Sequence, residues 1–161
     1  MATREKALSE KEVLEWFGKT IKAYEKGDEG FFDFFARDTS LFTVSSPTRV
    51  DGLEVYKSGF APYFVGFERV SQILSPEVRI LGPDAALLTF HNRILVGGLA
   101  NNIRGTVVIQ RQGDGKLAFV HMHNSPLTQA SAPAVGPADL ESISVLEERV
   151  AAASAMTGTP K

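Results

Sequence analysis

The sequence predicts an α+β domain in which helices precede an antiparallel β-sheet. Three observations favour this class. Apolar residues recur at helical spacing in the segment 9–67, whereas the segment 68–128 alternates between apolar and polar side chains. Turn signals separate the alternating runs, and Gly113-Asp114-Gly115 is a strong hairpin signal. Consecutive hairpins make an antiparallel meander, since a parallel sheet would alternate its strands with helices.

A first helix is predicted over residues 9–26. Ser9 and Glu12 form a capping box at its start, in which each side chain satisfies a backbone N–H group. Gly27 supplies the left-handed residue that commonly ends a helix. Between these signals the apolar residues follow a helical period: Val13, Trp16, Phe17, Ile21 and Tyr24.

Two shorter helices are predicted before the meander. Asp28 can cap the first, which should be largely buried because phenylalanines surround its axis. A short strand over Ser40–Val44 separates it from the second, over Leu53–Phe67. The second should be short or kinked, because glycine and proline interrupt it.

The meander is predicted as four strands, and the chain beyond it as a separate helix. Residues 1–128 then form the domain, and residues 129–137 form a linker rich in Ala, Ser, Pro and Gly. Residues 138–161 comprise an amphipathic helix, which Asp139 can cap, and a tail. The four strands span about 68–81, 84–97, 101–112 and 116–128.

Composition narrows the class of protein. A chain of 161 residues suits one domain, and its net charge of −2 offers no basic field for nucleic acid. The absence of cysteine removes thiolate chemistry and disulfides, and no long apolar stretch predicts a signal peptide or a membrane span. No cofactor motif is present, because neither glycine turn opens a helix. We therefore expect a cytoplasmic protein without a cofactor, nucleic acid or membrane as partner.

The end of the meander carries a recognisable pattern. Arg104-Gly105-Thr106 precedes an apolar run, followed by Gly113-Asp114-Gly115-Lys116 and then by Phe119-Val120-His121-Met122-His123-Asn124-Ser125. With the order of elements, this resembles the nuclear transport factor 2-like superfamily, in particular its SnoaL-like branch and the association domain of calcium/calmodulin-dependent protein kinase II. The resemblance spans about residues 9–128. Leu117 departs from it, because those families prefer tryptophan there.

The resemblance implies a cone-shaped, curved antiparallel sheet, or half-barrel, whose N-terminal helices close an apolar pocket. The C-terminal helix is extra to this fold. The resemblance also implies a homodimer or larger homo-oligomer joined through the outer sheet face. Isomerases, dehydratases, cyclases and assembly domains all use the fold, so the site has to decide the function.

Catalytic candidates are few. Ketosteroid isomerase-like relatives carry a catalytic aspartate where this chain has Val44-Ser45-Ser46-Pro47, and a hydroxyl cannot act as that base without a partner. His91 is the best acid–base candidate, because an imidazole titrates near neutrality and a rough alignment with the association domains, which the chain resembles, places it near their pocket arginine. It could equally be a hydrogen-bonded sheet residue. Tyr24 or Tyr63 could then orient a ligand through its hydroxyl.

The pocket walls are expected to be largely aromatic, although most of these phenylalanines could equally be core. Arg104 could clamp an anionic ligand or pair with an acidic residue across a dimer interface. The resemblance places Asn124 in the pocket, with Met122 on the same face. The full set of expected ligand-binding residues is Trp16, Phe35, Phe42, Phe60, Phe64, Met122, Asn124 and Arg104.

His121 and His123 lie two residues apart on one strand, so that both rings project from the same face as Phe119 and Ser125. No third ligand is tied to the pair by a recognisable spacing, so we expect no metal site. Because the opposite face carries Asn124, the resemblance assigns the histidines to a subunit interface.

Two functions remain open from sequence. The first is a ligand-binding and oligomerisation domain for a small apolar or weakly acidic molecule. The second is an isomerase, dehydratase or cyclase that acts on a polyketide- or steroid-like substrate, with His91 as acid–base. Docking of the C-terminal helix on a neighbouring subunit is a further possibility.

Overall fold

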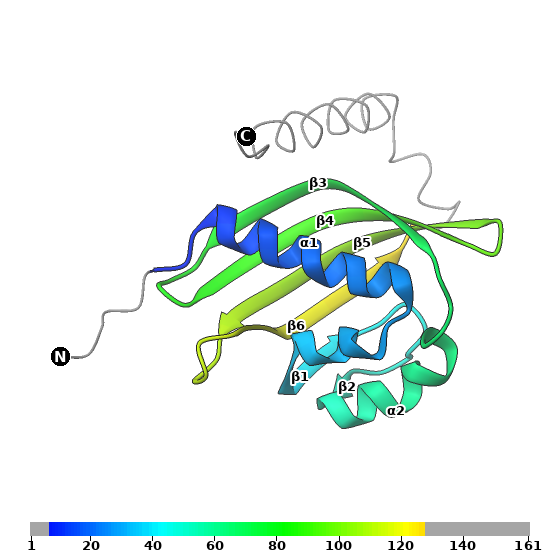
Figure 1. Ribbon diagram of the computed structural model, residues 1–161, viewed down its shortest axis with the longest axis horizontal. Helices are drawn as coiled ribbons and strands as arrows, with labels where there is room; N and C mark the ends of the chain where they lie inside the picture. The colour runs from blue at the N-terminus through cyan, green and yellow to red at the C-terminus, as the bar shows by residue number, and fades with distance from the viewer. Residues whose placement is uncertain (1–6, 128–161) are drawn as a thin grey trace, which may run out of the picture.

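A six-stranded sheet with helices on one face forms the computed structural model, which describes residues 7–127 (Figure 1). The strand order is β2-β1-β6-β5-β4-β3, and the sheet is open rather than closed into a barrel. The predicted linker over 129–137 and the helix within 138–161 lie outside the described residues. The elements are α1 (Glu10–Lys26), the 3-10 helix η1 (Glu29–Phe34), β1 (Phe35–Phe42), β2 (Val50–Asp51), α2 (Leu53–Phe64), β3 (Val70–Ile80), β4 (Ala85–Val96), β5 (Leu99–Arg111) and β6 (Leu117–Pro126).

α1 begins and ends where the sequence predicts. The Ser9 hydroxyl accepts a hydrogen bond from the Glu12 N–H at 3.2 Å, and Gly27 adopts the left-handed conformation with φ 61°. The second half of the predicted capping box is replaced, because the Glu12 carboxylate accepts a hydrogen bond from Arg111 instead. The start of α1 is thereby tied to the end of β5.

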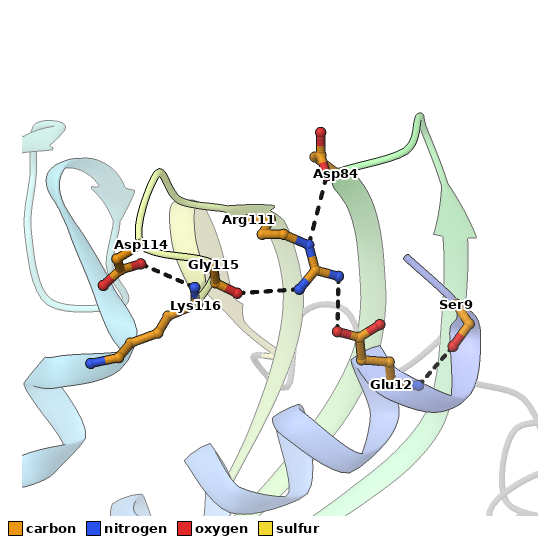
Figure 2. Close-up of polar contacts among 7 residues, drawn as sticks. All are labelled: Ser9, Glu12, Asp84, Arg111, Asp114, Gly115 and Lys116. Carbon is orange, nitrogen blue, oxygen red and sulfur yellow. Dashed lines mark hydrogen bonds and ion pairs between the residues drawn. The ribbon is translucent and has the colours of Figure 1, made fainter. Parts of the chain in front are cut away.

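Arg111 anchors one end of the domain, a role that the sequence analysis missed (Figure 2). Its guanidinium donates to Glu12 Oε1 at 2.9 Å and to the Gly115 carbonyl at 3.2 Å, while Asp84 Oδ1 lies 3.6 Å from its Nε. The side chain is only 13% exposed, so these partners compensate a charge that has left bulk water. They join α1, the beginning of β4 and the β5–β6 turn.

β3 to β6 form the predicted antiparallel meander, but the sheet also contains one parallel pair. β1 runs parallel to β6, and β2 pairs antiparallel with β1. β1 starts at Phe35, directly after η1, rather than at the predicted Ser40. Arg37 and Asp38 are consecutive polar residues, so they interrupt the apolar–polar alternation that would have predicted this first half of the strand.

A bulge in β6 corrects the predicted arrangement of side chains on that strand. Phe119 pairs with Ile109 whereas His121 pairs with Val108, so that Val120 is the extra residue. Phe119 is therefore buried on the inner face, not beside the histidines as regular alternation predicts. His121 is half-buried, and the ring of Phe42 on the neighbouring strand β1 packs against it on the same face of the sheet.

The core is largely aromatic and is centred on Phe64, which is completely buried. Its ring stacks on Phe60 and Tyr24, and Phe31 and Phe32 pack against it at centroid distances of 5.1 and 5.6 Å. Such pairs add to the free energy gained by burying their area. The buried contacts among α1, η1 and α2 are thus largely between rings.

Candidate functional site

A cavity of about 780 Å³ lies between the helices and the inner face of the sheet. Its floor comes from three adjacent strands, because every second side chain of a strand points to the same face. The alternation is clearest on β4, where residues 86, 88, 90, 92 and 94 are buried. The floor residues are Phe90, Asn92 and Ile94 of β4, Ile103 of β5, and Phe119, Met122 and Asn124 of β6.

Two helices and one loop form the walls and mouth. α1 contributes Thr20, Ile21 and Tyr24 among others, and α2 contributes the face that carries Tyr56, Phe60 and Tyr63. Residues 43–47, which lie between β1 and β2, line the rim. Tyr63 is 80% exposed and therefore stands at the mouth rather than inside.

The described residues that line the cavity include no aspartate, glutamate, histidine, lysine or arginine. Its polar groups are neutral: the hydroxyls of Thr20, Thr43, Ser45 and Ser46, two asparagine carboxamides, and the chain's three tyrosines. The Thr20 hydroxyl already donates to the Phe17 carbonyl at 2.8 Å, and the Ser46 hydroxyl donates to the Thr48 carbonyl at 2.7 Å. The tyrosines, the asparagines and the hydroxyls of Thr43 and Ser45 are thus the groups left to donate to a ligand.

Burial keeps the inner tyrosines protonated. It raises the pKa of Tyr24, and the neighbouring Arg69 opposes that rise through its charge and a hydrogen bond. Burial raises the pKa of Tyr56 far above its ordinary value, and the proximity of Tyr24 adds to the rise. Both side chains therefore present O–H groups, which can donate to an acceptor.

Arg69 holds Tyr24 in place. Its guanidinium lies over the ring of Tyr24 at 4.9 Å from the centroid and over that of Phe64 at 4.4 Å. It also donates to the carbonyls of Phe64 at 3.1 Å and Phe67 at 2.6 Å. The cation is therefore engaged by rings and carbonyls at the end of α2, its Nε has no hydrogen-bond partner among the described residues, and Arg69 itself does not line the cavity.

The two asparagines differ in their partners. Asn92 is 7% exposed, and its Oδ1 accepts a hydrogen bond from the Ser71 hydroxyl at 2.7 Å. This bond leaves the amide N–H groups of Asn92 for another acceptor. The Oδ1 atom of Asn124 is buried and has no partner among the described residues. An unsatisfied buried acceptor costs about 1–3 kcal/mol, so a donor from a molecule in the cavity would stabilise Asn124.

The structure brings together five of the residues expected from sequence. Tyr24, Tyr63, Phe60, Met122 and Asn124 line the cavity. Phe35 and Phe64 are core residues that do not line the cavity. The ring of Trp16 packs against those of Phe34 and Phe119. Phe42 is 41% exposed and packs against His123.

The expected positions of His91 and Arg104 are corrected. Phe90 and Asn92 point into the cavity, so His91, which lies between them, points to the outer face and is exposed. Arg104 is the register partner of His91 and is exposed there as well. Neither side chain can reach a molecule on the inner face. The rough alignment with the association domain wrongly placed His91 in the pocket. The alternation of apolar and polar residues along β4, which is visible in the sequence, indicates the outer face instead.

His121 and His123 lie on the outer face, as expected. His121 Nδ1 lies 2.8 Å from the Ser40 hydroxyl, and both rings pack against Phe42. Within residues 7–127 no group of three or more His, Asp or Glu side chains could hold a metal ion. None of the helices described is long and apolar enough to cross a membrane.

Sequence reasoning missed Tyr56 and Asn92. Tyr56 had a usable signal, since it precedes Phe60 by one helical turn and shares its face. Asn92 also had a usable signal, because it is a polar residue in an inward-facing row of β4 that otherwise holds Leu88, Phe90 and Ile94. A carboxamide in an otherwise apolar row needs a partner, and here the partner came from β3.

Comparison with known proteins agrees with this architecture. The model of the SnoaL-like domain matches residues 13–129. Among curated protein sequences, none matches the chain.

Solved structures with the same fold are distant in sequence. An NTF2-like protein of unknown function from Pseudomonas putida is 23% identical with a TM-score of 0.66, and the match covers 76% of this chain and 89% of that one. The CamKII hub homology domain of Chlamydomonas reinhardtii is 24% identical with a TM-score of 0.62, covering 73% and 97%. A ketosteroid isomerase-like protein from Parabacteroides distasonis is 20% identical with a TM-score of 0.63, covering 81% and 97%. At these identities the likeness shows the fold.

Proposed function

Because the chain belongs to the SnoaL-like domain family, we propose that it binds a small, largely apolar molecule in the cavity between its helices and its sheet. The observation that carries the proposal is the cavity itself. Its volume of about 780 Å³ falls within the range of about 300–1,000 Å³ typical of ligand sites. The lining is mostly apolar and aromatic, with a few neutral polar groups, which is the usual composition of such sites.

Binding is a better proposal than proton transfer. General acid–base catalysis needs a group whose pKa lies near the working pH. The residues described around the cavity offer only hydroxyls and carboxamides, and the pKa values of the inner tyrosines are raised away from neutrality. His91, the acid–base candidate of the sequence, faces the other side of the sheet.

Filling the cavity tests this proposal. Ile103→Trp adds a ring at a half-buried position of the floor, and we expect it to weaken binding of the neutral dye Nile red at least about tenfold, equivalent to roughly 1.4 kcal/mol. Gln110→Trp is the matched control, because it adds the same ring to the exposed outer face of the same strand. Fluorescence titration measures both affinities. Equal affinities for the two variants, or no dye binding to the wild type, would contradict the proposal.

We also propose that a second copy of this chain covers the outer face of the sheet. Phe42, half-buried His121 and exposed His123 form an aromatic group there, and exposed His91 and Arg104 lie on neighbouring strands. A large exposed ring among other rings is typical of interface residues. The fold is shared with a CamKII hub homology domain, and this supports self-association as a general possibility.

An acidic substitution tests this interface. We expect Phe42→Asp to convert an oligomer into monomers in sedimentation velocity, because it removes the apolar ring and the new carboxylate would lose its hydration in the interface. Ile80→Asp is the control, since Ile80 has the same 41% exposure but lies on the edge strand β3. A wild-type chain that sediments as a monomer would overturn the proposal, as would a Phe42→Asp variant that keeps the wild-type mass.

A further inference from the structure

We propose that Asn92 selects the ligand: an uncharged molecule with an apolar body whose oxygen accepts a hydrogen bond from the Asn92 carboxamide. The chemical class is a neutral carbonyl compound, such as a ketone, ester or amide, rather than a carboxylate. This inference rests on the proposed function, because it names what the cavity binds. It also departs from the weakly acidic ligand that the sequence allowed.

The position of Asn92 points to a ligand. It lies on the inner face of β4 between Phe90 and Ile94, is 7% exposed, and lines the cavity. A carboxamide left unsatisfied at such a place would cost about 1–3 kcal/mol. Its location at the floor therefore favours a function for its remaining hydrogen-bonding groups.

The hydrogen bond from Ser71 sets which half of the carboxamide is free. The Ser71 hydroxyl donates to Asn92 Oδ1 at 2.7 Å, and the Ser71 N–H in turn donates to Glu25 Oε1 at 2.8 Å. Ser71 is thus fixed between α1 and β4, and Asn92 is oriented by it. No hydrogen bond from the amide N–H groups of Asn92 to a described residue is present, so a ligand oxygen in the cavity can accept from them.

The two inner tyrosines favour a ligand acceptor as well, whereas Asn124 Oδ1 is itself an acceptor without a partner among the described residues. Tyr24 and Tyr56 keep their protons because burial raises the pKa of both side chains. A ligand that carries acceptor oxygens can therefore meet O–H donors at the walls and N–H donors at the floor. A ligand that carries only donors would leave these groups unpaired.

The charges around the cavity argue against an anion. No cationic side chain lines it within the described residues, and Arg69 is engaged by the Phe64 and Phe67 carbonyls. A carboxylate would lose its hydration without gaining an ion pair, which is costly in an apolar site. A carbonyl loses much less hydration and gains a neutral hydrogen bond.

A matched series of naphthalenes tests the inference. The probes are 2-acetylnaphthalene, 2-isopropylnaphthalene and 2-naphthoate, which share one ring system and differ in the acceptor and the charge. We expect the wild type to bind the ketone about tenfold more tightly than the hydrocarbon, and the carboxylate most weakly. Asn92→Leu should lose or reverse the preference for the ketone, because it keeps the volume but leaves the ketone oxygen without this donor. Ser71→Ala should weaken the preference for the ketone, because the carboxamide of Asn92 then loses the hydrogen bond that orients it. Isothermal titration measures each affinity, and circular dichroism checks that each variant is folded.

The outcomes separate the two proposals. If Asn92→Leu keeps the tenfold preference for the ketone, or if 2-naphthoate binds the wild type most tightly, the inference about Asn92 fails while ligand binding stands. If none of the three probes binds the folded wild type, both proposals fail. A folded Asn92→Asp variant, measured at a pH at which the new carboxyl group is ionised, gives a second check, since it keeps an acceptor for Ser71 but has no donor. It should lose the preference for the ketone as Asn92→Leu does.

Discussion

Replacing Gly27 with alanine should lower the free energy of unfolding by about 3 kcal/mol or more. Gly27 ends α1 in the left-handed conformation, with φ 61°, which costs a residue with a side chain about 1–2 kcal/mol. An alanine Cβ would also lie 2.5 Å from the Phe67 carbonyl oxygen and 2.7 Å from that of Phe64. These are backbone atoms, so the clash cannot be relieved by turning a side chain.

The site of this clash joins the two helices beside the cavity. The Gly66 N–H donates to the Gly27 carbonyl at 3.0 Å, so the ends of α1 and α2 touch through their backbones. Tyr24 lies one turn before Gly27, and Tyr63 lies one turn before Phe67. Separating the two ends would therefore move both tyrosines, and we expect ligand affinity to fall together with stability.

Two other glycines serve as controls in urea unfolding. Gly66 also has a positive φ of 81°, but an alanine Cβ there meets nothing within 4 Å, so Gly66→Ala should cost only the conformational part. Gly18 is exposed within α1 and equally open, so Gly18→Ala should stabilise the protein by about 0.5–1 kcal/mol. If Gly27→Ala costs no more than Gly66→Ala, the close approach of the two backbones is not the cause.

The elements that sequence predicts well here are those fixed by local signals. The cap residue Ser9 and the left-handed Gly27 define α1 without any tertiary information, and glycine turns define the hairpins of β4, β5 and β6. The parallel pairing of β1 with β6 joins residues about 80 positions apart, as the Ser40–His121 hydrogen bond shows. No local pattern encodes such a pairing, and it was not predicted.

The site was harder to predict for a related reason. Alternation alone would have assigned His91 to the outer face, whereas an alignment to distant relatives placed it in the pocket. Alternation itself fails on β6, because the bulge at Val120 turns Phe119 inward. The polar partner of Asn92 is Ser71, on a strand whose register no sequence pattern fixes. The floor of the cavity therefore becomes visible only with the sheet assembled.

Gly105→Ala is expected to disrupt the floor of the cavity by displacing the ring of Phe90. Gly105 lies on the inner face of β5, opposite Phe90 of β4 and Asn124 of β6. The ring of Phe90 covers the glycine: an added Cβ would lie 2.6 Å from Cε2, 2.9 Å from Cε1 and closer still to Cζ. The ring must move, and Phe17 already packs against it at a centroid distance of 4.9 Å. The space open to the displaced ring is the cavity, which Phe90 lines.

We therefore expect Gly105→Ala to cost about 1–3 kcal/mol of stability by overpacking and to weaken Nile red binding about tenfold. The cost arises even though alanine suits a strand better than glycine does, so the steric effect exceeds the backbone preference. Phe90→Leu should relieve the clash, because a smaller side chain no longer covers residue 105. In a double-mutant cycle measured by urea unfolding, the two substitutions should then couple favourably by about 1–2 kcal/mol. Additive effects would show that Phe90 and Gly105 do not share this space, and that the ring of Phe90 is not what limits the cavity at β5.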